Sequence, residues 1–345
     1  MGDEKVGDVL RSQGNLQGAL DLYQQGLTIA KRLAEQDKSN ASWQRDLSVS
    51  YEMVGYLLET QHKLSEALNA YQQSLKIRQT LAEQHKSNVG AQRDLLMSYE
   101  RVGYVLRVQG KLEDALDAYR QSLKIVQTQA EQDRFNTGWQ RELAVSHERV
   151  GELLVAQGKL PEALDAYQQS LKILQTLAEQ DKSNPDWQRE LAVSYEKVGD
   201  VLRTQGKLEE ALELYQQGLA ISKRLADQDG SNAGRQRDLS LGYEMVGYLR
   251  ETQGKLPEAL DAYQQSLKIR QTLVEKDKTN SIWQRDLIVS LYEVGRTTAR
   301  IGRKDSVLQA QGILQTALNL AERYPGSDRQ NLIDALNLAL RNLVH

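Results

Sequence analysis

The chain has 345 residues, a formal net charge of −3 and no cysteine. The lack of cysteine excludes disulfides, thiol catalysis and cysteine-ligated metals, and it fits a reducing compartment. The small net charge gives no reason to expect nucleic acid or an anionic membrane surface as a partner. Because no apolar run is long enough to span a membrane and residues 1–10 do not resemble a signal peptide, we expect a soluble, cytoplasmic protein.

A repeat of 48 residues runs through most of the chain. An arginine in a WQRDL-like motif marks it at Arg45, Arg93, Arg141, Arg189, Arg237 and Arg285, and a glycine marks it at Gly7, Gly55, Gly103, Gly151, Gly199, Gly247 and Gly295. A fixed period of this size is typical of supersecondary structures that stack and bury their apolar faces on their neighbours. Few prolines and many Leu, Ala, Gln, Glu and Lys residues favour helix throughout.

Each repeat is predicted to form two helices. The first begins at an asparagine, whose side chain can cap the first turn, and ends at a glycine, which can take the left-handed conformation. The asparagines are Asn40, Asn88, Asn136, Asn184, Asn232 and Asn280, and the glycines are Gly110, Gly158, Gly206, Gly254 and Gly302. His62 replaces the glycine once, at a cost in stability. The second helix begins in a KLxEAL motif and is expected to run to the next asparagine.

This pattern resembles the tetratricopeptide-repeat family. The family pattern of an aromatic residue, an aliphatic–glycine pair, a large residue, an alanine and a second aromatic residue is matched at Tyr51, Val54, Gly55, Leu58, Ala67 and Tyr71. The match recurs in most repeats and covers residues 1 to about 325. The longer repeat and the missing proline at the end of the second helix indicate longer helices than the family usually has. The resemblance implies an all-α, right-handed superhelical solenoid of antiparallel helix pairs, whose first helices line a concave face.

The two ends are expected to differ from the middle. We expect seven repeats over residues 1–325, the first truncated at its N-terminus, and a C-terminal capping helix within residues 326–345. The truncation suggests a fragment of a longer array or an engineered start. It would leave an open apolar edge through which the protein could self-associate, formed by Val6, Leu10, Leu16 and Leu20.

The sequence contains no motif that indicates catalysis or cofactor binding. P-loop, GxGxxG, HExxH and GxSxG motifs are missing. The four histidines share no metal-ligand spacing, and the many carboxylates are typical of solvated helix faces. We therefore expect no enzyme activity, no catalytic residue, no cofactor and no metal.

Two recurrent residue types near the start of the first helices are interpreted as structural. The tryptophans Trp43, Trp139, Trp187 and Trp283 are expected to cover the preceding second helix, with ligand stacking as the alternative. The recurrent arginine, Arg45 for example, is expected to bond carboxylates near the end of the preceding helix, such as Glu35 or Asp37.

The candidate binding surface lies beside the apolar stripe of the first helices. An acidic residue stands three positions before the recurrent glycine, and neighbouring columns carry tyrosine, arginine and further acidic residues. The candidate residues are Glu52, Tyr56, Glu100, Tyr104, Arg107, Glu148, Glu152, Glu196, Asp200, Arg203, Glu244 and Tyr248. The family resemblance implies that these columns face the groove. An ordinary solvated helix face is the alternative.

We therefore expect a protein-interaction scaffold that holds an extended or helical segment of a partner protein in its groove. The alternative is a structural spacer, sensor or self-associating array of a larger multidomain protein. Helical-repeat RNA binding would need a basic groove, so the expected partner is a protein or peptide, with no nucleic acid and no membrane. Residues 51–57 recur at 243–249, which indicates either a recent duplication alone or two equivalent binding patches.

Overall fold

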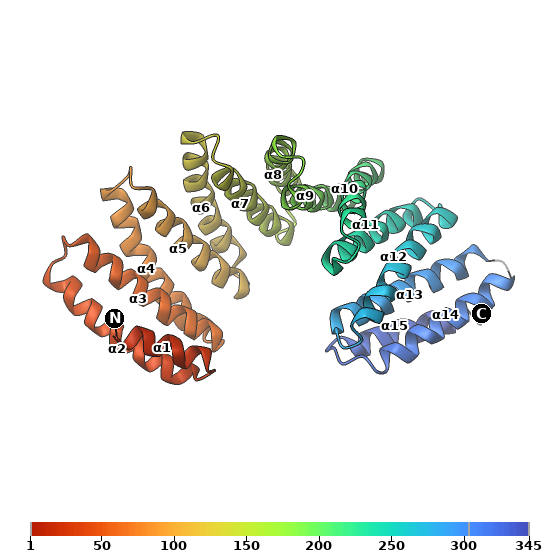
Figure 1. The fold of residues 1–345 in the computed structure, drawn as a ribbon, viewed down its shortest axis with the longest axis horizontal. Coiled ribbons are helices and arrows are strands. Elements are labelled where there is room, and N and C mark those ends of the chain that lie inside the picture. The colour runs from red at the N-terminus through yellow and green to blue at the C-terminus, as the bar shows by residue number, and fades with distance from the viewer. Residues whose placement is uncertain (1, 303, 344–345) are drawn as a thin grey trace. The chain divides into compact units, whose positions relative to one another are not determined.

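The computed structural model describes residues 2–302 and 304–343. These residues form fifteen α-helices and no strand, and within residues 2–156 and 185–341 consecutive helices pack on one another (Figure 1). The all-α fold of consecutive helix pairs is therefore confirmed, and the hand of the superhelix stays a prediction. The chain divides into two compact units, Met1–Ile173 and Leu174–His345, which we call the N-terminal unit and the C-terminal unit.

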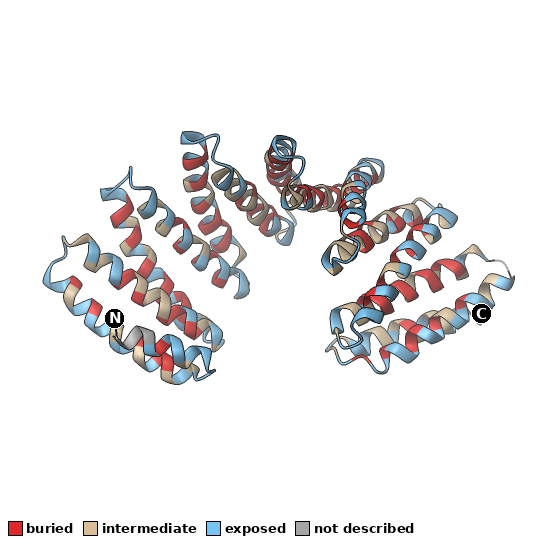
Figure 2. Cartoon of the chain, in the orientation of Figure 1, coloured by how far each residue is buried: buried red, intermediate tan, exposed pale blue. Residues whose placement is uncertain are grey.

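The division falls inside helix α8 (Leu160–Gln180). The N-terminal unit contains α1 (Gly2–Ser12), α2 (Leu16–Gln36), α3 (Ala41–Thr60), α4 (Leu64–Gln84), α5 (Val89–Val108), α6 (Leu112–Gln132) and α7 (Thr137–Ala156). The C-terminal unit contains α9 (Pro185–Thr204), α10 (Leu208–Gln228), α11 (Ala233–Thr252), α12 (Leu256–Lys276), α13 (Ser281–Ile301), α14 (Lys304–Ala321) and α15 (Arg329–Arg341). Buried positions recur along the helices of both units (Figure 2). None of the helices described is long and apolar enough to cross a membrane.

The first helices begin and end where the sequence predicted. The Asn40 side chain accepts a hydrogen bond from the backbone N–H of Trp43 at 3.1 Å, and the five later asparagines cap their helices in the same way. At the other end of α3, His62 takes a left-handed φ of 60°. The Lys63 N–H then bonds the Leu58 carbonyl at 2.8 Å. This is the Schellman geometry, in which glycine normally occupies the position of His62.

The second helices end earlier than the sequence predicted. Helix α2 ends at Gln36, before Asn40. The Asp37 carboxylate accepts hydrogen bonds from the Ser39 N–H at 2.9 Å and the Ser39 hydroxyl at 2.6 Å, and these bonds lower the pKa of Asp37. An aspartate that bonds the backbone two residues later offers the chain a turn in place of another helical turn. The expectation that the helix continues to the asparagine was therefore wrong.

In all helix pairs except α13–α14, the recurrent glycine meets the second aromatic residue, whereas Gly295 of α13 meets Leu314. A Cβ atom placed on Gly55 would lie 2.8 Å from Cε1 of Tyr71, and one placed on Gly199 would lie 2.5 Å from Cε1 of Tyr215. No side chain fits at these distances, so glycine lets the tyrosine ring lie directly on the helix backbone. Tyr71 and Tyr215 are both buried in consequence.

The ends of the chain carry different surfaces. In α1, Val6 and Val9 are 53% and 52% exposed, whereas Leu20 of α2 is buried and is no part of an exposed edge. At the other end, Leu336 of α15 is buried against Leu291 and Leu318. The predicted capping segment extends to residue 345, and its residues 344–345 lie outside the part that the structure describes.

Candidate partner-binding site

Four predicted site residues line one open pocket in the C-terminal unit. They are Asp200, Arg203, Glu244 and Tyr248, from the first helices α9 and α11. The pocket has a volume of about 380 Å³, and Tyr215, Tyr263 and Glu293 also line it. Because α9 and α11 are the first helices of successive repeats, residues at neighbouring positions of the repeat line the same pocket. We call these seven residues the α9–α11 site.

The exposed tyrosine of the α9–α11 site is held by an arginine. Tyr248 is 45% exposed, and the guanidinium carbon of Arg203 lies 5.2 Å from the centre of its ring. Arg203 also forms an ion pair with Asp200 at 3.3 Å. A cation over the ring face attracts the aromatic quadrupole. The ring is therefore held in place although a large part of it faces solvent.

The two other tyrosines of the site belong to second helices and are buried. The Tyr215 hydroxyl donates to Asp200 at 2.6 Å, and the Tyr263 hydroxyl donates to Glu251 at 3.0 Å. Burial raises the pKa of both tyrosines, and the carboxylates add to the shift. Both hydroxyls therefore stay protonated and keep their hydrogen bonds at neutral pH.

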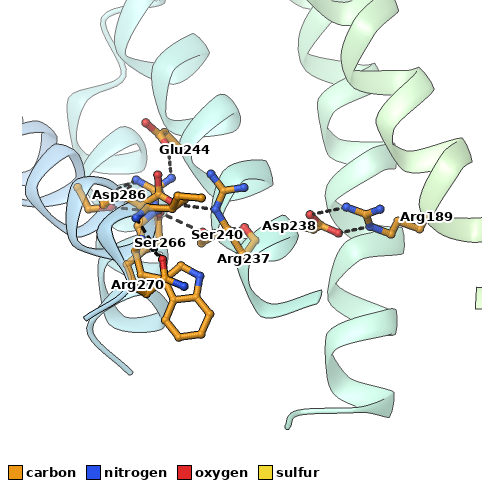
Figure 3. A network of polar contacts seen from close by, with 12 residues as sticks. Arg189, Arg237, Asp238, Ser240, Glu244, Ser266, Arg270 and Asp286 are labelled. Atoms are coloured by element: carbon orange, nitrogen blue, oxygen red, sulfur yellow. Dashed lines mark hydrogen bonds and ion pairs between the residues drawn. The ribbon is translucent and has the colours of Figure 1, made fainter. Parts of the chain in front are cut away.

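Glu244 accepts its hydrogen bond from a buried arginine (Figure 3). Arg270 of α12 is 2% exposed. Besides the bond to Glu244, it donates to the Ser240 hydroxyl at 3.2 Å, to the Asp286 carbonyl at 2.9 Å and to the Ser290 hydroxyl at 2.9 Å. The glutamate thus balances a charge inside the fold and is no simple solvated residue.

Sequence reasoning missed this arginine. In the other repeats the same position of the second helix is Ala30, Val126, Leu174, Ser222 or Leu318, and it is arginine only at Arg78 and Arg270. Charged residues are rarely buried without a partner. An isolated arginine in a small or apolar column was therefore the signal that could have revealed the network.

Glu196 has different surroundings from Glu244. Ser222 stands where the later repeat has Arg270. It lines a small pocket together with Glu196 and Asp238. Burial raises the pKa of Glu196 from its ordinary value of 4.5 to about 7, with further contributions from Asp238 and Asp200 against Arg189. The predicted glutamate column is therefore not uniform, because one member titrates near neutral pH.

The N-terminal unit repeats the arrangement of the α9–α11 site. The Arg11 guanidinium lies 5.5 Å from the ring centre of Tyr56. Glu52 accepts two bonds from the buried Arg78, at 2.7 and 2.8 Å, and the Tyr71 hydroxyl donates to Glu59 at 2.7 Å. These residues match Arg203, Tyr248, Glu244, Arg270, Tyr263 and Glu251, each 192 positions later.

The remaining predicted residues lie on α5 and α7 and form internal contacts. The Arg107 guanidinium lies 5.4 Å from the ring centre of Tyr104 on the same helix. Glu100 pairs with Arg149, and Glu148 accepts from the Ser170 hydroxyl at 3.1 Å. Glu152 is exposed on α7.

The recurrent arginines bond forward along the chain. Arg45 Nε donates to Asp94 of the next repeat at 2.9 Å. Arg189 donates to Asp238 at 2.5 Å and Arg237 to Asp286 at 2.7 Å (Figure 3). The prediction of Glu35 or Asp37 as partners was wrong, because the side chain extends to the next first helix. No group of three or more histidine and carboxylate side chains in the described part could hold a metal.

The paired helices and the glycine–tyrosine packing define a helical-repeat protein. Models of the tetratricopeptide repeat match residues 5–37, 94–176 and 142–224. The chain therefore contains tetratricopeptide repeats, a kind of repeat that in general forms protein-interaction scaffolds. No curated protein matches the chain in sequence.

Solved structures share the fold at low sequence identity. BtubC (BKLC) from P. vanneervenii is 17% identical with a TM-score of 0.54, over 75% of this chain and 92% of that one. The apo form of RapI is 13% identical with a TM-score of 0.55, over 95% and 80%. The C-terminal part of a TPR repeat-containing protein from Cytophaga hutchinsonii is 12% identical with a TM-score of 0.53, over 95% and 98%. Such similarity shows the fold alone.

Proposed function

We propose that the chain is a non-catalytic scaffold that binds a segment of a partner protein at the α9–α11 site and at its equivalent around Tyr56. The observation that carries the proposal is an exposed tyrosine, Tyr248, fixed by Arg203 beside an open pocket of about 380 Å³. Tyrosine buries a large rigid surface at little entropic cost and keeps a polar tip, and it is often a main contributor to binding energy. Because the lack of cysteine fits a reducing compartment, we place this function in the cytoplasm.

The repeated arrangement supports two sites of the same specificity. Arg11 and Tyr56 have the same ring contact as Arg203 and Tyr248, and Glu52 and Glu244 are held by equivalent buried arginines. Since Glu52 and Glu244 balance internal arginines, these two glutamates do not require a cationic partner. Shape and the exposed tyrosine ring are then the main determinants of the bound segment.

The test is a titration with a peptide selected on the full chain from a display library. We expect two equal sites per chain. Tyr56→Ala and Tyr248→Ala should each remove one site, and the double variant should bind at least tenfold more weakly, about 1.4 kcal/mol. Phe135→Ala is the matched control, because Phe135 is an aromatic residue that is 93% exposed in the loop before α7. A peptide that binds the double variant normally would refute the proposal.

A second candidate function is self-association through α1. The exposed Val6 and Val9 favour it, since exposed apolar residues often mark contact surfaces. Light scattering coupled to size exclusion tests it without any partner. Dimers that dissociate in a Val6→Lys, Val9→Lys variant would support self-association, and a monomer at high concentration would exclude it.

A further inference from the structure

One position of the first helices is occupied by a large side chain in every repeat but one. The third helical residue is Trp43, Trp139, Trp187, Arg235 or Trp283, and in α5 it is Ala91. Gly90 precedes Ala91, so two successive residues of α5 are small. A tryptophan at this place is partly buried in each of the four repeats that have one.

Within the N-terminal unit, the tryptophan at this position, Trp139, contacts an arginine of the preceding repeat. The guanidinium carbon of Arg93 lies 6.0 Å from the centre of the Trp139 ring. Arg93 is the recurrent arginine of the preceding repeat, 46 residues earlier. The arginine at the same distance before Ala91 is Arg45, and alanine offers it no ring.

The missing side chain leaves an open pocket at the N-terminal ends of α3 and α5. Its volume is about 390 Å³, and it is lined among others by Arg45, Arg78, Leu81, His85, Ala91 and Asp94. A cavity of about 150 Å³ already admits benzene. The pocket therefore has room for an indole, and its rim at Ser42, His85 and Gly90 is exposed.

The arginines of the pocket already have partners within the protein. Arg45 is bonded to Asp94 at 2.9 Å. Arg78 is 4% exposed, and it is held by Glu52, by the Asp94 carbonyl at 3.0 Å and by the Ser98 hydroxyl at 3.1 Å. Both charges are thus balanced by the protein itself, so the pocket calls for a neutral ring.

The C-terminal unit contains the same framework with a tryptophan in place. Arg237, Arg270, Leu273 and Asp286 correspond to Arg45, Arg78, Leu81 and Asp94, and Trp283 corresponds to Ala91. Arg270 bonds the Asp286 carbonyl and the Ser290 hydroxyl as Arg78 bonds Asp94 and Ser98. The arginine network is therefore compatible with an indole at this position.

We propose that the Ala91 pocket binds the side chain of a tryptophan that a partner protein presents on its surface. Tryptophan has the most favourable ring for a neighbouring cation, and the chain itself uses it four times at this position. The open rim allows a residue that is attached to a polypeptide to enter. The pocket contains none of the predicted site residues around Tyr56 and Tyr248, so the proposal does not depend on the function proposed above.

The test uses N-acetyl-L-tryptophanamide and the full chain, with binding followed by ligand-observed NMR and calorimetry. We expect one site with a dissociation constant on the order of 1 mM, as is usual for a fragment. Ala91→Trp should reduce binding at least tenfold because it fills the pocket. Trp283→Ala should add a second site, because it opens the equivalent pocket in the C-terminal unit.

Controls separate loss of the pocket from loss of the fold and from other sites. Circular dichroism and thermal melts check each variant, and Ala91→Leu is a smaller filling variant that should also weaken binding. Tyr248→Ala should leave the affinity unchanged. Undiminished binding to folded Ala91→Trp would overturn the proposal, as would equal binding of N-acetyl-L-leucinamide. Binding of free indole without binding of the amide would also overturn it, because the pocket would then exclude a residue within a polypeptide.

Discussion

At the scale of single residues, His62 is the least suitable residue for its backbone conformation. It ends α3 with a φ of 60°, where five later repeats have glycine. A left-handed conformation costs a residue with a Cβ about 1–2 kcal/mol, and glycine avoids this cost. Glycine also makes the unfolded chain more flexible, and the additional entropy cancels part of the gain in stability. His62→Gly should therefore raise the free energy of unfolding by roughly 0.5–1 kcal/mol. Gly254→His, at the duplicated position, should lower it, and denaturant titrations that show no change in either variant would contradict the argument.

Glu196 predicts a specific dependence of stability on pH. Its pKa in the folded chain is raised to about 7, so the native state binds a proton that the unfolded state has released above its pKa of 4.5. Glu196 therefore lowers stability progressively as pH rises from about 4.5 to 7 and by a constant amount above that. Glu196→Gln should be as stable as the wild type near pH 4 and more stable by ~3 kcal/mol at pH 8.

A matched variant distinguishes this effect from a general response to lost charge. Glu244→Gln removes an equivalent glutamate, but one that accepts a bond from the buried Arg270. Leaving a buried charge without its partner destabilises a protein, so this variant should be less stable than the wild type at pH 8. If calorimetry at pH 8 shows the same change in the free energy of unfolding for both variants, burial of Glu196 is not the cause of the effect on stability.

The sequence predicted the columns of the candidate site better than their contacts. Asp200, Arg203, Glu244 and Tyr248 were expected to share a surface, and they line one pocket. The bonds of Glu244 could not be predicted, because Arg270 lies on another helix and only packing brings the two together. The same holds for Arg45, whose partner Asp94 is 49 residues away.

At the scale of helices, the contact between glycine and tyrosine determines how closely a pair can pack. A Cβ atom on Gly247 would lie 2.8 Å from Tyr263 Cδ1. Overpacking of a core costs about 1–3 kcal/mol, and the better helix propensity of alanine offsets up to about 1 kcal/mol. Gly247→Ala should therefore destabilise the chain by about 1–2 kcal/mol.

The control for this prediction is a glycine of α2 with free space around it. A Cβ on Gly26 would have no neighbour within 4 Å, so Gly26→Ala should stabilise the helix by about 0.5–1 kcal/mol. Thermal melts of both variants measure the two changes in stability, which should have opposite signs. Changes of the same sign would mean that the tyrosine contact does not limit the approach of the helices.

Helix starts could be predicted from the sequence more reliably than helix ends. Asn40 and its equivalents provide a local signal, because a capping side chain acts on its own helix. The ends of the second helices depend on competition between the helix and the turn at Asp37 and Ser39. An aspartate two residues before a serine, which recurs at Asp181 and Asp229, was a signal for that turn.

At the scale of the whole molecule, each compact unit has buried residues of its own. In the C-terminal unit, Leu287, Leu314 and Leu336 belong to one apolar cluster. Repeat arrays are stabilised by contacts between neighbours, so part of an array can fold alone. A fragment of residues 174–345 should be helical by circular dichroism and should melt cooperatively at a lower temperature than the full chain. An unfolded fragment would show that the unit depends on residues 1–173. This division could not be predicted from the sequence, because the repeat continues through α8 without interruption.

The hydrogen bond between Arg285 of the last repeat and Asp328 has a consequence for the evolution of this gene. Arg285 donates to Asp328, just before α15, at 2.6 Å, as Arg45 donates to Asp94 of a further repeat. Asp328 thus accepts the hydrogen bond of Arg285 that an aspartate of a further repeat would otherwise accept. Recombination between near-identical stretches of the gene could add or remove one repeat and still leave an arginine beside Asp328. Alleles with different numbers of repeats would then all keep the contact at Asp328, so the length of the array could vary without loss of this contact.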